Sequence, residues 1–232
     1  MSKLPHLLAL LALIAASTGY SEDKPYIAVG SAKTKKTVIA IAPIQADPML
    51  RNEAKQVVET VNSDLKFMDL FRFLEPAAFI EGAGAGISPG TFKMTDWSSI
   101  GAEFVAKSAM TREGGNIRLE GFLYDTFGSK QLFTKRYLAA QQDSKALAHT
   151  FANDIVTALT GLPGIFQTKI AMSCERGGKK EIHIMNFDGS DARQLTRHNS
   201  IAFAPAWHPG GTKLAYSLYT RHSNNVKNID LY

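Results

Sequence analysis

Four histidines in the carboxy-terminal third are the residues whose type could hold a transition metal, since imidazole nitrogen is a common zinc and copper ligand. They are His183, His198, His208 and His222. The intervals between them are 15, 10 and 14 residues, much longer than the ligand spacings within zinc motifs. This spacing favours histidines on separate strands and turns, so we expect no metal site.

Sequence motifs of the common enzyme classes are absent. The chain contains no G-x-S-x-G nucleophile elbow, no H-E-x-x-H motif and no P-loop. The Gly-Ala run at residues 82–86 lacks the helix start of a dinucleotide fingerprint, because residues 87–90 continue as a loop. Asp188 and Asp191 flank a tight turn, where aspartate is expected for its backbone hydrogen bonding. We therefore predict that the protein is not an enzyme and binds no cofactor.

A repeated pattern positions most of these histidines and aspartates. Residues 170–173 (Ile-Ala-Met-Ser) recur as residues 214–217 (Leu-Ala-Tyr-Ser), an offset of 44 residues. Each copy leads through a polar connection into a second alternating run, and a short strand candidate at residues 193–196 lies between the copies. Four short strands in about 40–45 residues is typical of a β-propeller blade. We expect residues 163–232 to form the first blade and part of the second, with further blades to cover them.

The part before the repeat, residues 22–162, predicts an α/β domain with a mixed sheet and packed helices. A helix follows Asp47, the predicted N-cap, and a second follows Asp143 or Ser144 and ends at Gly161. Gly128 is predicted to take the positive φ of a type II′ hairpin turn. The predicted strands and the short third helix are residues 25–30, 37–44, 71–74, 96–101 (helix), 103–110, 116–127 and 131–140.

The amino terminus, residues 1–21, predicts a cleavable signal peptide. Lys3 is followed by a short apolar run at residues 7–16 and then by small residues. A membrane anchor is the alternative, but the run is shorter than the roughly 20 residues that span a bilayer. We therefore expect export to the periplasm and a mature chain without a membrane span.

Composition and charge limit the class of partner. The chain has 232 residues, with 45% hydrophobic and 20% charged residues, which is ordinary for a globular protein. The net charge of +5 is scattered except at Lys33, Lys35 and Lys36, whereas a nucleic-acid-binding protein shows a basic stripe with aromatic platforms. We expect no nucleic-acid partner. Cys174 is the only cysteine, so an internal disulfide is impossible.

The residues of the repeat also resemble a known family. Residues 173–182, 185–190, 194–196 and 205–207 resemble the first propeller repeat of the TolB family of the Tol/Pal system. The order of signal peptide, small α/β domain and propeller is also that of the family. One departure is His-Pro-Gly-Gly at residues 208–211, where the family usually has Ser-Pro-Asp-Gly.

The resemblance implies a periplasmic protein-binding adaptor that links inner-membrane Tol proteins to the outer-membrane lipoprotein Pal. Pal is implied as the partner of the propeller, and TolA as the partner of the mature amino-terminal segment. The alternative is the amino-terminal fragment of a propeller-capped secreted hydrolase, because similar propellers cap serine peptidases. The α/β domain ahead of the blades favours the adaptor.

The mature amino-terminal segment is the first candidate partner-binding element. A short polar tail ahead of a strand can add to the sheet edge of another protein, and the resemblance points to TolA as that protein. The alternative is a disordered tail. The candidate residues are Glu22, Asp23 and Lys24.

The second candidate is the loop at residues 198–203, which must cross an end face of the propeller. In the family that this chain resembles, that end carries the Pal site. An aromatic beside polar side chains suits an interface core with a polar rim. The candidate residues are His198, Asn199 and Phe203, and the alternative for Phe203 is packing between blades.

Overall fold

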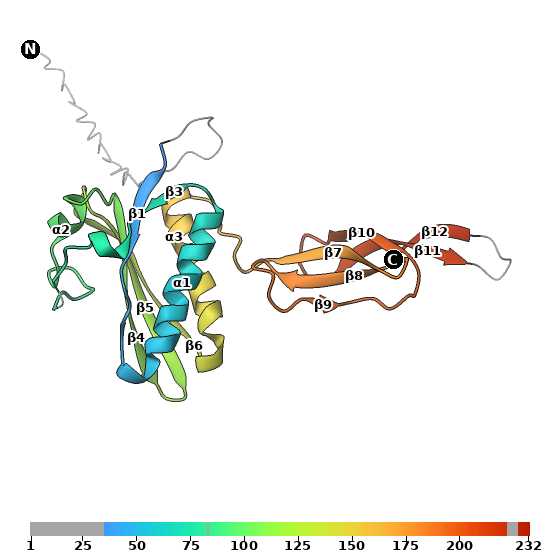
Figure 1. Ribbon diagram of the computed structural model, residues 1–232, viewed down its shortest axis with the longest axis horizontal. Helices are drawn as coiled ribbons and strands as arrows, with labels where there is room; N and C mark the ends of the chain where they lie inside the picture. The colour runs from blue at the N-terminus through green and yellow to red at the C-terminus, as the bar shows by residue number, and fades with distance from the viewer. Residues whose placement is uncertain (1–34, 83, 222–226) are drawn as a thin grey trace, which may run out of the picture.

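The computed structural model describes residues 35–82, 84–221 and 227–232. An α/β domain and an elongated strand-rich region follow one another and are joined by a linker (Figure 1). The predicted signal peptide, the predicted strand at residues 25–30 and the candidate residues Glu22, Asp23 and Lys24 lie outside the described residues, as does His222.

One mixed sheet forms the centre of the α/β domain, as predicted. Its main strands lie in the order β3-β1-β4-β5-β6. β1 is parallel to both β3 and β4, whereas β4, β5 and β6 are antiparallel. The strands are β1 (Thr37–Ile41), β3 (Phe71–Phe73), β4 (Phe104–Glu113), β5 (Asn116–Asp125) and β6 (Lys130–Ala140), with the short β2 (Gln45–Ala46) paired to β4.

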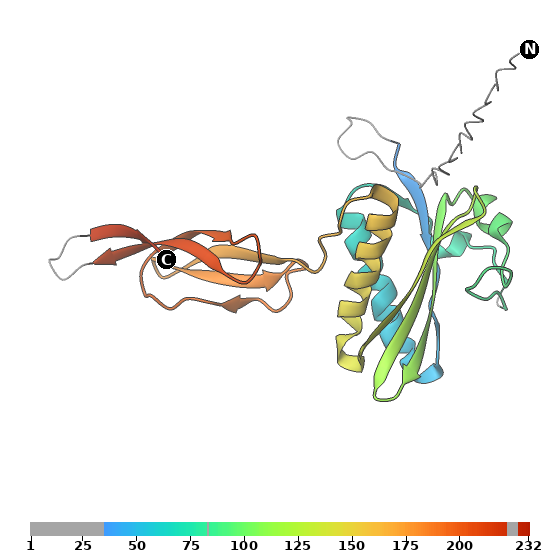
Figure 2. The ribbon, with the colours of Figure 1, turned by 180° about the vertical axis from the view of Figure 1, so that it is seen from behind.

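Two long helices, α1 (Arg51–Phe67) and α3 (Ser144–Thr160), pack against each other and cover one face of the sheet (Figures 1 and 2). Their apolar residues at helical spacing meet alternate strand residues in the main core. Gly121 on β5 makes this packing possible, because a Cβ there would lie 2.6 Å from the Phe151 ring. α1 also supplies the crossover that the parallel pair β1 and β3 requires.

The predicted cap of α1 at Asp47 was wrong. A 3-10 turn, η1 (Pro48–Leu50), precedes the helix, so Asp47 does not lie at the start of α1 and makes no side-chain cap hydrogen bond. Its carboxylate instead accepts a hydrogen bond from the backbone N–H of Arg112 at 3.3 Å. η3 (Gln141–Asp143) precedes α3, and Asp143 occupies the N-cap position of α3, as predicted, but makes no side-chain cap hydrogen bond.

The opposite face of the sheet is covered by residues 74–103, which include η2 (Pro76–Ala78) and the predicted short helix, α2 (Met94–Ser98) (Figure 1). Lys107 on β4 points into this layer with only 2% of its side chain exposed. Its Nζ lies 2.5 Å from Glu81 Oε1 and 4.5 Å from the centre of the Phe92 ring. Trp97 also donates to Glu81, at 2.9 Å. This buried ion pair fastens the long covering segment to the sheet.

The backbone angles at two turns bear on the glycine predictions. Gly161 has φ +73° and ends α3, as predicted. At the β5–β6 turn the positive φ of +50° belongs to Ser129, so the prediction for Gly128 was wrong. Gly128 serves a different purpose, because its N–H donates to Asp125 Oδ1 at 2.9 Å and a Cβ there would lie 2.5 Å from the other carboxylate oxygen.

The strand-rich region contains two three-stranded antiparallel sheets, in the orders β7-β8-β9 and β10-β11-β12. Each has three strands where the repeat predicted four, and the described strands form no closed sheet. The strands are β7 (Lys169–Arg176), β8 (Lys179–Asn186), β9 (Arg193–Gln194), β10 (Ala202–Trp207), β11 (Leu214–Arg221) and β12 (Lys227–Leu231). A small core of Ile182, Ala202 and Leu218 joins the two sheets.

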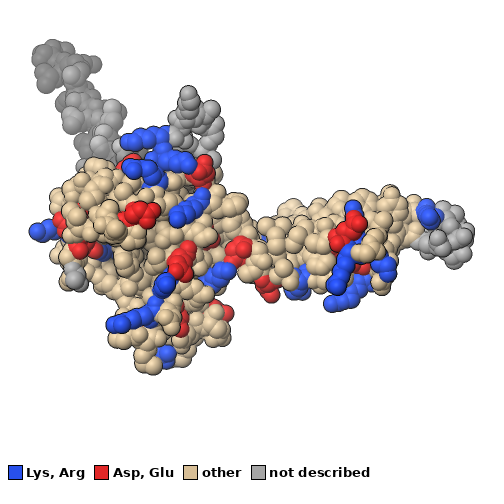
Figure 3. All heavy atoms as spheres, in the orientation of Figure 1, with Lys and Arg blue, Asp and Glu red and all other residues tan. Residues whose placement is uncertain are grey.

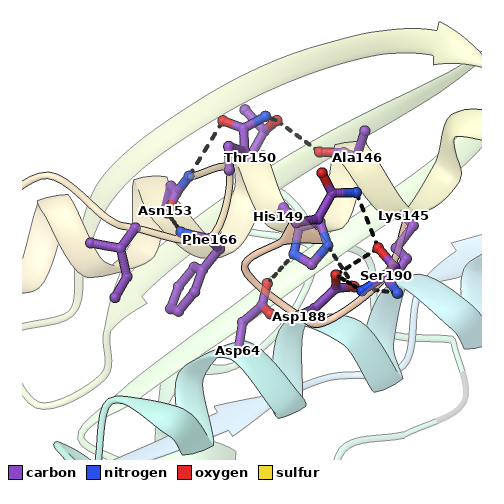
Figure 4. Close-up of polar contacts among 12 residues, drawn as sticks. Asp64, Lys145, Ala146, His149, Thr150, Asn153, Phe166, Asp188 and Ser190 are labelled. Atoms are coloured by element: carbon purple, nitrogen blue, oxygen red, sulfur yellow. Dashed lines mark hydrogen bonds and ion pairs between the residues drawn. The ribbon is translucent and has the colours of Figure 1, made fainter. Parts of the chain in front are cut away.

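The turn between β8 and β9 contacts the helices of the α/β domain (Figure 4). Asp188 forms an ion pair with Lys145, and its Oδ2 lies 3.5 Å from Nε2 of His149. The other ring nitrogen of His149 lies 2.7 Å from Asp64. Beside these polar groups, the Phe187 ring packs edge-on against Phe67, with ring centres 4.7 Å apart. The two regions are therefore joined by side-chain contacts as well as by the linker.

Candidate partner-binding site

The loop before β10 is held by Glu181 on β8, whose carboxylate accepts hydrogen bonds from three residues. Thr196 Oγ1 donates to it at 2.6 Å and the backbone N–H of Asn199 at 2.7 Å. Burial raises the pKa of Glu181, but these bonds and that from the backbone of His198 outweigh it, so the pKa lies below its ordinary value. The charged carboxylate therefore fixes the backbone that presents His198.

Asn199 has a structural role in this loop. Its φ of +55° lies in the left-handed region, which asparagine tolerates better than most residues. Lys179 Nζ lies 3.3 Å from its side-chain oxygen. Asn199 is exposed, as predicted, but it also shapes the turn that carries His198.

The imidazole of His198 lies against two tyrosines. Its Nε2 is 2.9 Å from Tyr216 Oη, and its ring centre lies 5.7 Å from that of Tyr216 and 5.8 Å from that of Tyr232. The two tyrosine rings are stacked, with centres 5.8 Å apart and planes 14° apart. Burial and the nearby Tyr232 and Glu181 raise the pKa of Tyr216. We call His198, Tyr216 and Tyr232 the aromatic cluster.

The prediction that Phe203 lies in a surface loop was wrong. Phe203 is the second residue of β10, pairs with Ser217 on β11 and is half-buried. Its ring centre lies 5.9 Å from that of Tyr219. The ring thus packs on a neighbour within its own sheet, because strand alternation places the two side chains on one face. Residues 205–207 also belong to β10.

Sequence reasoning missed Tyr216, Tyr232 and Glu181. The repeat held a signal for one of them, because Tyr216 stands where the first copy has Met172. An aromatic in place of an aliphatic residue indicates a different neighbour. The contact with Tyr232 could not be predicted, since it depends on the backbone hydrogen bonds that pair Tyr232 with Tyr216 across 16 positions, at 2.9 and 3.0 Å.

The side chains of this site are of the kinds found at protein interfaces. The exposed Tyr232 ring, the half-buried Tyr216 ring and the neighbouring amide and imidazole groups suit protein recognition. Within the described residues no cluster of three or more His, Cys, Asp or Glu side chains could hold a metal ion. The part of the chain that the structure covers also has no helix long and apolar enough to cross a membrane.

Comparison with known proteins gives matches to both parts of the chain. Residues 25–132 match the family model of the TolB amino-terminal domain. The Tol-Pal system protein TolB of Anaeromyxobacter dehalogenans (strain 2CP-C) is 31% identical over 212 residues, covering 91% of this chain and 49% of that protein. The Protein TolB homolog of Chlorobium chlorochromatii is 32% identical over 202 residues, covering 85% of this chain and 45% of that protein.

Among solved structures, that of TolB from Acinetobacter baumannii is similar with a TM-score of 0.66 and 20% identity. The match covers 86% of this chain and 50% of the other, and it shows a shared fold. The chain spans about half the length of the curated relatives that it matches.

Proposed function

Because the chain belongs to the TolB family, we propose that it acts in the periplasm as a non-catalytic adaptor of the Tol-Pal system, linking inner-membrane Tol proteins to the outer-membrane lipoprotein Pal. The observation that carries the proposal is the likeness of 91% of the chain to a protein named for that system. The names of the relatives favour the adaptor over a hydrolase fragment.

The two strand-rich sheets are proposed to be the first pieces of a β-propeller. The repeat aligns β7 with β11 and β8 with β12, whereas β10 precedes β11 and β9 follows β8. Each sheet thus contains three of the four strands of the repeating unit: β7-β8-β9 lacks the first strand, and β10-β11-β12 lacks the last. Ile229 and Leu231 on β12 are 49% and 79% exposed, as expected of a blade face that another blade covers. On this proposal residues 1–21 are the signal peptide, 22–162 the α/β domain and 163–232 propeller repeats.

The aromatic cluster is proposed as part of the Pal-binding surface. We expect His198→Ala to weaken Pal binding by about 1 kcal/mol or more, because it removes an exposed ring that is already ordered by Tyr216. Calorimetric titration of Pal into the protein measures the change. Asn199→Gly should weaken binding less, since glycine keeps the left-handed backbone.

The control for this prediction is His208→Ala, which removes a histidine from the β10–β11 turn instead. It should leave Pal affinity unchanged. Equal affinity of the wild-type and His198→Ala proteins would reject the site. A fall in melting temperature of the same size as that caused by a core substitution would show instead that His198 is structural.

The mature amino-terminal segment is proposed to bind TolA. Deleting residues 22–25, which include Glu22, Asp23 and Lys24, should lower TolA affinity while leaving the melting temperature nearly unchanged, because this polar tail precedes the sheet. Titration with the purified carboxy-terminal domain of TolA measures the effect, and a scrambled segment of the same composition is the control. If the deletion and the wild-type chain bind TolA equally, the segment is only a tail.

A further inference from the structure

A groove lies beside α1 at the carboxyl ends of β1 and β3, far from the aromatic cluster. Its volume is about 720 Å³, within the range of ligand pockets. Apolar side chains, among them Ile44, Val58, Phe73 and Leu74, form its floor and sides. The chain leaves β1 toward α1 on one face of the sheet and leaves β3 toward α2 on the other. Such divergence at the carboxyl ends of parallel strands is where α/β sheets bind ligands.

The backbone of β1 has a free edge in this groove. Thr37 N–H and Ile39 C=O bond to the β3 side, at Leu70 and Leu74, whereas Val38 and Ala42 bond to the β4 side. Because backbone direction alternates along a strand, the N–H and C=O of Ile41 face the β3 side. β3 ends at Phe73, opposite Ile39. Backbone pairing on that side continues only as far as the bond from Leu74 N–H to Ile39 C=O, and among the described residues no backbone hydrogen bond to Ile41 is found there.

A buried backbone pair without partners is unusual, because more than nine in ten such groups are hydrogen-bonded. Ile41 is only 7% exposed. The groove beside it follows α1 from Arg51 to Lys66, a length of about 22 Å at 1.5 Å per residue. An extended chain of about six or seven residues spans that length. The position past the end of β3 thus has room for a short extended segment and offers it the N–H and C=O of Ile41, whereas Pro43, the next residue facing that side, has no N–H.

Charged side chains along the rim of the groove limit the chemical class of ligand that it can bind. Arg51, Lys55 and Lys66 line the groove together with two carboxylates, and Lys55 already pairs with Glu59 at 3.8 Å. On the face seen in Figure 3, which carries α1, acidic and basic side chains are interspersed with uncharged surface. A purely anionic amphiphile does not suit the groove, because the rim carries carboxylates as well as cations. A polypeptide with alternating apolar residues and a carboxylate does match the lining.

We propose that this groove binds an extended segment of a partner protein, which adds as a strand beside Ile41 and packs alternate apolar side chains on Ile44, Val58 and Phe73. Strand addition gains affinity from main-chain hydrogen bonds and specificity from the pockets for alternate side chains. A carboxylate of the segment pairs with Arg51 or Lys66. The site is separate from the proposed Pal and TolA surfaces, so its test does not depend on them.

The experiment uses a phage-displayed library of random heptapeptides, selected on the whole chain and depleted on Val58→Asp. Enriched peptides are expected to alternate apolar and polar residues and to shift the amide resonance of Ile41. Ile44→Asp should weaken them by at least about tenfold, because it places a carboxylate on the apolar floor. Asn52→Asp, an exposed change on α1 outside the groove, is the matched control and should leave binding unchanged.

N-methylation of the peptide distinguishes strand pairing from other binding. Since alternate residues of a strand face opposite edges, methylating one set of amides should abolish binding and methylating the other set should not. Equal tolerance of both sets, no enriched peptide, or no response of Ile41 overturns the proposal. Slow hydrogen exchange of Ile41 that is lost on deleting residues 25–30 also overturns it, because the chain's own segment would then fill the groove.

Discussion

Replacing Glu81 with glutamine is expected to destabilise the α/β domain by about 3–5 kcal/mol, the usual cost of removing one partner from a buried ion pair. The exposed fractions of the two side chains are 2% for Lys107 and 14% for Glu81. Glutamine can still accept the hydrogen bond of Trp97, but it leaves the lysine ammonium uncompensated between two aromatic rings. Urea unfolding of the wild-type and variant chains, followed by far-UV circular dichroism, measures the difference.

The double variant Glu81→Gln, Lys107→Met is the matched control. Because replacing both partners of a buried pair with uncharged groups is often close to neutral, it should recover most of the lost stability. If the double variant is as unstable as the single one, the cost comes from packing and not from the buried charge. A loss below about 1 kcal/mol in the single variant would show that water reaches Lys107 and screens it.

The Lys107 pair also predicts a pH dependence. Burial lowers the pKa of Lys107 below its ordinary 10.5, and the hydrogen bond and charge of Glu81 oppose this. A group whose pKa is lower in the folded state gains stability as pH rises toward its unfolded value. Removing Glu81 lowers the folded pKa of Lys107 further, so the stability deficit of the variant should shrink as the pH rises toward 10.5.

Composition and periodicity were sufficient for most elements of the α/β domain. Val57, Val61 and Leu65 recur at helical spacing and are buried in α1, the helix that was predicted after Asp47. Lys107 shows why the other face was not foreseen. It lies in a stretch of β4 in which the side chains on both faces of the strand are buried, so no alternation marks it. A buried lysine is possible there only because the fold places Glu81, 26 residues earlier in the chain, beside it.

The candidate site was predictable where it depends on the local chain and not where it depends on neighbours. His198 and Asn199 follow a short strand and are exposed, as expected of a connection. Phe203 was misplaced because an alternating run after a polar loop can be read as loop or strand, and pairing with β11 decides it. The groove beside Ile41 could not be predicted, because it arises where the pairing of β1 with β3 stops at Ile39 while its pairing with β4 continues to Ile41.

The contact between the two regions depends on the charge of Asp188. Its Oδ1 accepts hydrogen bonds from the N–H and hydroxyl of Ser190, at 3.0 and 2.6 Å, so the carboxylate is already oriented before it meets Lys145 and His149. Only 15% of the side chain of Asp188 is exposed. Figure 4 shows these side chains converging between the β8–β9 turn and the helices.

Asp188→Asn should weaken this contact by about 2 kcal/mol, which is within the range for hydrogen bonds to charged groups. Asparagine keeps the shape and can still accept from Ser190, but it no longer attracts Lys145. The backbone N–H of Phe187, which bonds to Thr168 at 3.0 Å, should exchange faster, and residues 161–168 should be cut more readily by protease. Asp191→Asn is the control, because Asp191 is exposed and asparagine tolerates its φ of +54°.

Acidification should weaken the same contact, and the pH range of the loss should identify the carboxylate of Asp188 as its cause. Burial raises the pKa of Asp188, but hydrogen bonds from Lys145 and Ser190 outweigh it and hold the pKa below the ordinary 3.8. A carboxyl group whose pKa is depressed by docking stabilises the docked form above pH 3.8, and this contribution is lost as the pH falls through the depressed value. His149 and Asp64 face the same point, so the Asp188→Asn variant is needed to separate their effect.

Below pH 3.8 the wild-type Phe187 amide should lose protection, whereas that of Asp188→Asn, already exchanging faster, should change little. Parallel pH profiles for the two proteins would show that the acid response does not come from Asp188.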